Sequence, residues 1–173
     1  GVTEINVDGP VGAGVGVQLG SLEDSVTEAG FSADVQFGVM DDAGAIATEL
    51  AGDAGALDNA EHVVVDGGDT TVAGASDIQG VAAYDASGSA YTITDSASAI
   101  LGDTGSVIDE GVSGVIVADA TGASSVDAVD GAALSELEVL LASDDSGADV
   151  EFRIEDSAGA IAAELSSDNT LLD

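Results

Sequence analysis

The side chains that could do chemistry in this sequence are almost all carboxylates. Two short stretches combine them with turn-forming glycines, Asp66–Asp69 (DGGD) and Asp144–Asp149 (DDSGAD). Ca²⁺ takes about six to eight oxygen ligands, which acidic loops can supply. Neither stretch has the spacing of an EF-hand or of tandem glycine-rich nonapeptides, and Asp/Gly turns are common in acidic proteins. Calcium is the only cofactor that the sequence suggests, with Asp66, Asp69, Asp144, Asp145 and Asp149 as candidate ligands.

A second set of carboxylates closes predicted strands. Asp41, Asp95 and Asp156 each end an alternating apolar run, and a short polar residue follows each of them. Metal ligation is one interpretation. The interpretation that we favour is helix capping, because short polar side chains accept hydrogen bonds from the free N–H groups at a helix N-terminus. The residues that follow are Asp42, Ser96 and Ser157.

Catalytic constellations have little support. His62 is the only histidine, without a second histidine or cysteine nearby, so a structural role is favoured. Gly12–Gly20 has glycines but no lysine, which makes it a poor phosphate loop. Paired carboxylates for glycoside hydrolysis are available, but 3% aromatic residues and no tryptophan offer little platform for a sugar. We therefore expect no enzyme, and a halophilic hydrolase is the least favoured hypothesis.

Arg153 is the only basic residue among 34 acidic ones, and it stands between Glu151 and Glu155. We expect it to pair with these neighbouring carboxylates, and an exposed pair of this kind contributes at most about 1 kcal/mol. The alternative is that Arg153 meets acidic side chains of another subunit.

These residues are organised by a repeated segment. The sequence Ala148–Leu165 recurs without gaps at Ala33–Leu50, with twelve of eighteen positions identical, and a weaker copy occupies Ala90–Leu101. Each copy begins with alternating apolar and polar residues, the period of a half-buried strand, and continues with apolar residues at helical spacing. The repeat predicts a strand that leads directly into a helix.

The whole chain reads as three rounds, near residues 1–60, 61–111 and 112–173, each ordered strand, turn, weak strand, helix, strand, helix. Helices between strands act as crossovers, so the strands should be mostly parallel. Each strand–helix pair has an apolar face that it cannot bury alone, so the rounds should stack. We predict an α/β fold of three stacked repeats, solenoid-like or layered, in one domain over residues 1–173.

The glycine-rich stretch Val11–Gly20 is predicted as the weak strand of the first round, before a short helix at Ser21–Ala29. Its apolar residues alternate with Gly and Gln, so another backbone could approach its bare face. An exposed strand of this kind can pair with a neighbouring chain. The candidate assembly residues are Val15, Val17, Leu19 and Arg153.

The composition limits the medium in which the chain can fold and the classes of partner that it can bind. The 173 residues are 45% hydrophobic, enough for a core, and carry a net charge of −33. Self-repulsion of this size destabilises a compact state in dilute buffer, and salt screens it. The acidity argues against nucleic acid and anionic membrane as partners, since both need basic patches. No stretch has the roughly 20 apolar residues of a membrane span, and there is no cysteine. The opening at Gly1 without a signal peptide indicates a processed protein or a segment of a longer one.

Several strand endings carry a family resemblance. TITDSASAI (Thr92–Ile100) and RIEDSAGAIAAEL (Arg153–Leu165) resemble the tandem β-strand/α-helix repeat modules of large secreted bacterial surface proteins. VVVDGGDTTVAGASDI (Val63–Ile78) is similar to the second half-unit of those modules. The family often carries calcium-binding RTX-type repeats nearby. The resemblance implies an extracellular structural or adhesive role.

Taken together, these observations predict an extracellular or cell-surface structural subunit. It would assemble with itself, as a homo-oligomer or polymer, into a filament, sheath or surface layer in a saline environment. The alternative is a calcium-dependent adhesin or binding module of a larger surface protein.

Overall fold

The computed structural model describes residues 4–32, 34–103, 107–108, 111–118, 125–143 and 149–167. They belong to two compact units, Gly1–Tyr91 and Thr92–Asp173. The division lies within one strand of the second predicted round, so the units do not coincide with the predicted rounds. The single domain and the count of three repeats stay predictions.

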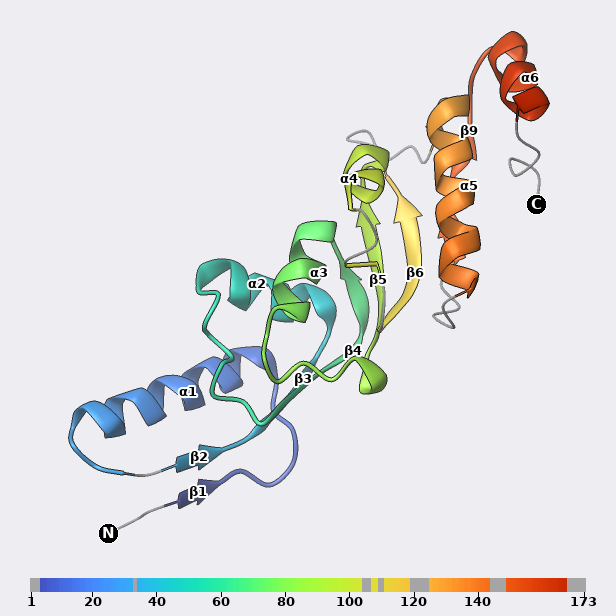
Figure 1. Ribbon diagram of the computed structural model, residues 1–173. Helices are drawn as coiled ribbons and strands as arrows, with labels where there is room; N and C mark the ends of the chain where they lie inside the picture. The colour runs from blue at the N-terminus through green and yellow to red at the C-terminus, as the bar shows by residue number, and fades with distance from the viewer. Residues whose placement is uncertain are drawn as a thin grey trace. The chain divides into compact units, whose positions relative to one another are not determined.

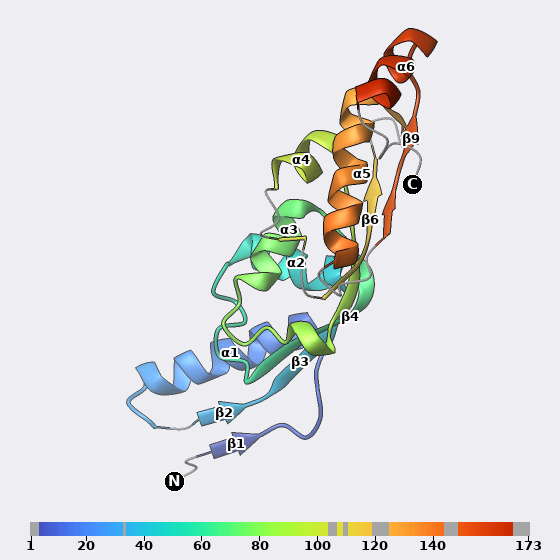
Figure 2. The ribbon, with the colours of Figure 1, turned by 45° about the vertical axis from the view of Figure 1, so that its right-hand side comes forward.

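The first unit alternates strands and helices along the chain (Figure 1). Its elements are β1 (Glu4–Asn6), α1 (Ala13–Glu28), β2 (Asp34–Gln36), β3 (Gly38–Asp41), α2 (Ala43–Gly52), β4 (His62–Thr70), α3 (Val72–Gln79) and the 3₁₀ turn η1 (Ala86–Gly88). The three α-helices lie along one side of these strands in both Figure 1 and Figure 2. They therefore cover one face of the strands.

The second unit repeats this alternation. Its elements are β5 (Ala90–Asp95, which begins in the first unit), α4 (Ala97–Gly102), β6 (Val112–Val117), β7 (Ser125–Val126), α5 (Ala128–Ser143), β8 (Asp149–Glu151), β9 (Arg153–Ile154) and α6 (Ala158–Ser167). α5 packs against β8, β9, α4 and α6. No helix in the described ranges of the chain is long and apolar enough to cross a membrane.

The strand pairs β1–β2, β3–β4, β6–β8 and β7–β9 are all parallel. Each parallel pair needs a crossover to bring the chain back to the same end, and the helices provide it. The predicted α/β class with mostly parallel strands is confirmed.

The core of the first unit is built from the alternating residues of the repeat. Val35, Phe37 and Val39 are at most 1% exposed, because alternate side chains of a strand share one face. α1 packs on β2 and β3, and α2 packs on α1 and β4. α2 buries the apolar stripe that the sequence predicts. The residues of this stripe are Ala43, Ile46 and Leu50, all buried.

The prediction for Val11–Gly20 is wrong. Val11 makes one parallel bridge to Val39, and a single helix, α1, then runs from Ala13 to Glu28 through both the predicted strand and the predicted short helix. The reason is tertiary. Gly16 is buried against the strands, where a Cβ on it would lie 2.7 Å from Val39 Cγ2. Close helix–strand packing therefore overrides the poor helix propensity of glycine.

The two units contain the same construction at a fixed distance along the chain. Ala128 of α5 follows Ala13 of α1 by 115 residues, and Ala158 of α6 follows Ala43 of α2 by 115. The tight glycine recurs as well, because a Cβ on Gly131 would lie 2.6 Å from Ile154 Cγ1. Positions in the two units can therefore be compared one by one.

We expect Gly16→Ala to lower the free energy of unfolding by about 1–3 kcal/mol, because the added methyl group overpacks the contact with Val39. Gly14→Ala is the matched control, since its Cβ would meet only the flexible end of Glu49, 3.3 Å away. The control should be neutral or stabilising by up to about 1 kcal/mol, owing to helix propensity. Urea titration followed by tyrosine fluorescence measures both, since Tyr84 and Tyr91 both lie in the first unit. Equal effects of the two variants would contradict the close packing.

Candidate functional site

The short polar residues at the strand ends are helix caps, as predicted. The side-chain oxygen of each accepts a hydrogen bond from the N–H three residues later, at 2.9–3.2 Å. The donor–acceptor pairs are Ala45 to Asp42, Ala99 to Ser96, and Ala160 to Ser157.

The preceding aspartates cap a different helix, which the sequence did not predict. Asp41 Oδ2 accepts a hydrogen bond from Ala13 N at 2.9 Å, and its Oδ1 accepts one from Asp42 N at 3.0 Å. Asp156 Oδ2 accepts one from Ala128 N at 3.2 Å, across the same 28 residues. Each carboxylate thus joins the end of its strand to the first turn of the preceding long helix, whose N-terminal dipole favours a negative charge. The equal spacing was the only sign of this link in the sequence.

Asp41→Ala should lower the free energy of unfolding by about 1–2 kcal/mol, because α1 loses its external cap and two N–H groups lose an acceptor. Asp77→Ala, on the exposed side of α3, removes the same charge without a cap and should change stability by less than about 0.5 kcal/mol. Urea titrations at fixed salt give both values. A loss with Asp77→Ala as large as that with Asp41→Ala would assign the effect to charge instead of capping.

Of the five candidate calcium ligands, the structure describes Asp66, Asp69 and Asp149. Asp66 and Asp69 lie in β4 around Gly67 and Gly68, which have φ angles of 84° and 77°. The residues that the structure describes contain no group of three or more His, Cys, Asp or Glu side chains placed to hold a metal ion. Asp149 is exposed at the start of β8. Asp144 and Asp145 lie outside the described residues, so calcium binding at that loop stays a prediction.

His62 packs against a glycine of the neighbouring strand. Its imidazole ring lies over Gly38 on the neighbouring strand, in the space that a Cβ on residue 38 would need. Hydrogen bonds from Ser87 Oγ and Gly88 N hold the pKa of the nearby Asp85 below its usual range, and the charge of His62 contributes. The contact explains why residue 38 is a glycine, because a Cβ there would meet the imidazole ring.

Arg153 pairs with a neighbour, as the sequence predicts. Its Nη2 lies 3.0 Å from Glu155 Oε2, and both side chains are exposed. The guanidinium therefore remains accessible to a further carboxylate.

The candidate assembly residues of the first unit lie on a helix. Val15, Leu19, Leu22 and Val26 follow at helical spacing, and all are exposed or half-exposed, Val15 by 49% and Leu22 by 43%. We call these four residues the α1 stripe. With about 100° between successive residues, the stripe faces neither the strands, which contact Gly16, nor α2, whose Glu49 lies beside Gly14. Val17 is half-buried between these faces. Donation of a strand by this segment is therefore excluded, but an apolar helix surface takes its place.

The last strand–helix pair of the second unit is far less buried than its counterpart in the first unit. In the first unit four apolar side chains are at most 3% exposed: Phe37, Val39, Ile46 and Leu50. The residues 115 positions later are all half-exposed: Phe152, Ile154, Ile161 and Leu165. We call this second set the α6 end.

The difference comes from the neighbours. In the first unit β4 pairs with β3, and α3 packs on α2. In the second unit, within the described residues, β9 has one partner strand, β7, and α6 packs mainly against α5. The α6 end is thus the apolar surface of a repeat whose next neighbour is missing from the described structure.

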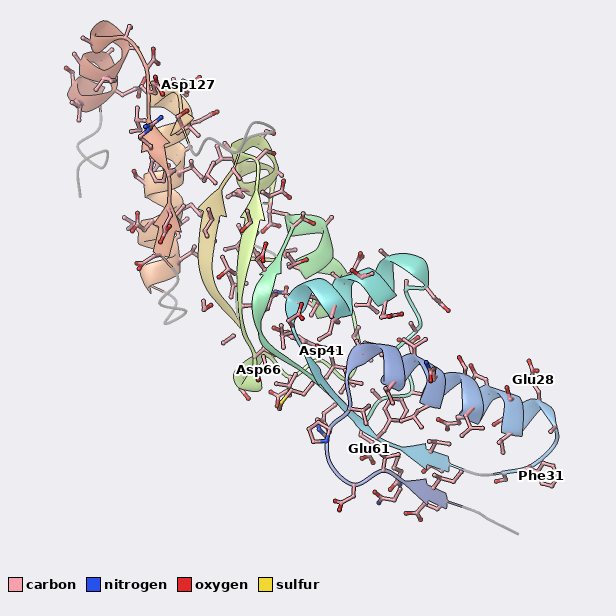
Figure 3. The ribbon with its side chains drawn as sticks, turned by 180° about the vertical axis from the view of Figure 1, so that it is seen from behind. Glu28, Phe31, Asp41, Glu61, Asp66 and Asp127 are labelled. Atoms are coloured by element: carbon pink, nitrogen blue, oxygen red, sulfur yellow. The ribbon has the colours of Figure 1, made fainter. Side chains whose placement is uncertain are left out.

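Figure 3 labels two acidic residues at helix ends, Asp127 directly before α5 and Glu28 at the last position of α1. Phe31, 68% exposed, follows α1 in the same view. No family model, curated protein or solved structure matches this chain.

Proposed function

We propose that this protein is a structural subunit that assembles with itself outside the cell in a saline environment. The main support for this proposal is that two copies of the same repeat are buried to different extents. The segment that is buried as Phe37, Val39, Ile46 and Leu50 in the first unit recurs at the α6 end, where the same positions are half-exposed. Stacked repeats gain stability from the interface with each neighbour, so an uncovered repeat favours association.

Charge explains why the medium must be saline. Each copy brings a charge of −33 to a contact with another copy, and this repulsion has a range of about 10 Å at 0.1 M salt but about 3 Å at 1 M. An apolar contact between such surfaces forms only when the range of repulsion is short. The resemblance to secreted surface-protein repeats supports an extracellular filament, sheath or surface layer as the product.

The test is negative-stain electron microscopy of the purified chain in about 1 M NaCl, with calcium and with chelator. Ordered fibres or sheets support the proposal, whereas dispersed monomers in every condition overturn it. Magnesium at equal concentration is the control for charge screening. Assembly with calcium but not with magnesium would indicate a bridging calcium ion, as in a calcium-dependent surface module.

A further inference from the structure

The first unit shows how a strand–helix pair equivalent to the α6 end is covered by a neighbouring pair. In the first unit, β3 and α2 are covered by the strand–helix pair β4–α3. The pair β1–α1 has the same construction. Glu4 begins β1 five residues before Gly9, as His62 begins β4 five residues before Gly67, and both glycines have a φ angle of 84°. A capped helix follows in each case. β1–α1 is thus the counterpart of β4–α3.

β1–α1 also has an open side. Among the described strands, β1 pairs only with β2, so its other edge presents N–H and C=O groups that another strand can pair with. The α1 stripe adds apolar surface on the helix. Within the described residues, no strand–helix pair follows the α6 end, and none precedes β1–α1.

We propose that the α6 end of one copy is covered by β1 and α1 of a second copy, in the register in which β4 pairs with β3. This inference rests on the proposed function and specifies its interface. It uses contacts that the chain already makes once within its first unit.

The proposed register places opposite charges next to each other on the two paired strands. Within the first unit Gly38 is paired with His62, and Val39 with Val63. Shifted to the counterparts, Arg153 lies opposite Glu4 of the second copy, and Ile154 lies opposite its Ile5. The only basic residue of the chain thus meets a carboxylate on the exposed face of the strands. Directly opposite charges on neighbouring strands attract, whereas like charges repel.

The helices come together on the other face. In the first unit α3 approaches α2 so closely that a Cβ on Gly74 would lie 3.1 Å from Ala47 Cβ. Counted from the first helical residue, Ala13 in α1 and Val72 in α3, the counterpart of Gly74 is Val15, in the α1 stripe; this count is one position out of step with the strand register. The counterpart of Ala47 is Ala162, which is exposed. Valine is larger than glycine, so we expect α6 and α1 to lie further apart than α2 and α3. Ile161 and Leu165 then face the α1 stripe.

This contact is heterologous, because it joins two different surfaces. Each added copy leaves one α6 end and one β1–α1 end free, and such contacts build open filaments or rings, according to the rotation between copies.

Sedimentation velocity tests the interface at the lowest NaCl concentration at which the wild type is both folded, by circular dichroism, and assembled. Ile161→Glu should raise the concentration needed for assembly at least roughly a hundredfold, because it places a charge in an apolar contact. Val139→Glu is the matched control. It adds the same charge at an exposed position of α5, outside the α6 end, and should assemble as the wild type does.

The charge pair tests the register. Arg153→Glu alone and Glu4→Arg alone should each raise the assembly concentration roughly tenfold, because each places like charges opposite one another. An equimolar mixture of the two variants should assemble again, since every junction between unlike chains then joins opposite charges. A general effect of charge on folding would not produce this rescue.

The outcomes separate this inference from the proposed function. If the wild type assembles and Ile161→Glu does so equally well, the interface is overturned while the structural function stands. If the single reversals weaken assembly and their mixture does not restore it, the register is overturned. If Ile161→Glu destabilises the monomer as strongly as Ile46→Glu, the α6 end is covered within its own chain. A wild type that stays monomeric at every salt concentration overturns both.

Discussion

Replacing Phe37 by alanine should lower the free energy of unfolding of the first unit by about 3–5 kcal/mol. Phe37 is 1% exposed between α1 and the strands, and its ring lies beside Gly16, so truncation leaves a cavity that the close helix cannot fill. Total stabilities of domains are only about 5–15 kcal/mol. The variant should therefore unfold at a much lower urea concentration, as measured by tyrosine fluorescence at fixed molar salt.

Phe152→Ala is the matched comparison, because it makes the same change at the equivalent position of the second unit. Phe152 is half-exposed, so we expect a loss of about 1 kcal/mol in the monomer. Circular dichroism follows this variant, because the second unit contains no tyrosine or tryptophan. Equal losses for the two variants would show that the α6 end is buried in the isolated chain.

The NaCl concentration should determine whether the chain is folded. With a net charge of −33, we expect little folded protein below about 0.1 M NaCl and a cooperative unfolding transition above about 1 M, because screening shortens the repulsion. Circular dichroism melts across a NaCl series measure this, with sucrose as the uncharged control. Melting temperatures that do not change with NaCl would contradict the role of repulsion.

The effect of charge repulsion on stability can be tested at a single side chain, Glu23. Partial burial raises the pKa of Glu23 on α1, and the charges of Asp34 and Asp24 raise it further. A carboxyl group with a raised pKa in the folded state is stabilising when protonated, and this contribution is lost as pH rises through that pKa. Glu23→Gln should therefore raise the melting temperature at neutral pH, more in low salt than in high salt. Glu28→Gln, at the exposed end of α1, removes the same charge and should raise it less.

The sequence by itself determined the α/β class, the parallel strands and the helix caps. These features are local, since a period of two residues defines each strand face, and a short polar residue before an apolar helical stripe defines each cap. Asp42, Ser96 and Ser157 could be assigned from their positions alone. The pairing of Arg153 with Glu155 was also predictable, because alternate residues of a strand share a face.

Only the tertiary structure decided the conformation of Val11–Gly20 and the burial of the repeats. Valine and glycine alternate there as in a strand, but Gly16 is a helix residue because a strand two dozen residues later packs against it. Asp41 holds the first turn of the same helix for the same reason. The repeat copies make the point most directly. Ile46 and Ile161 stand in the same local sequence, yet one is buried and the other half-exposed, because burial depends on the element that packs next to them.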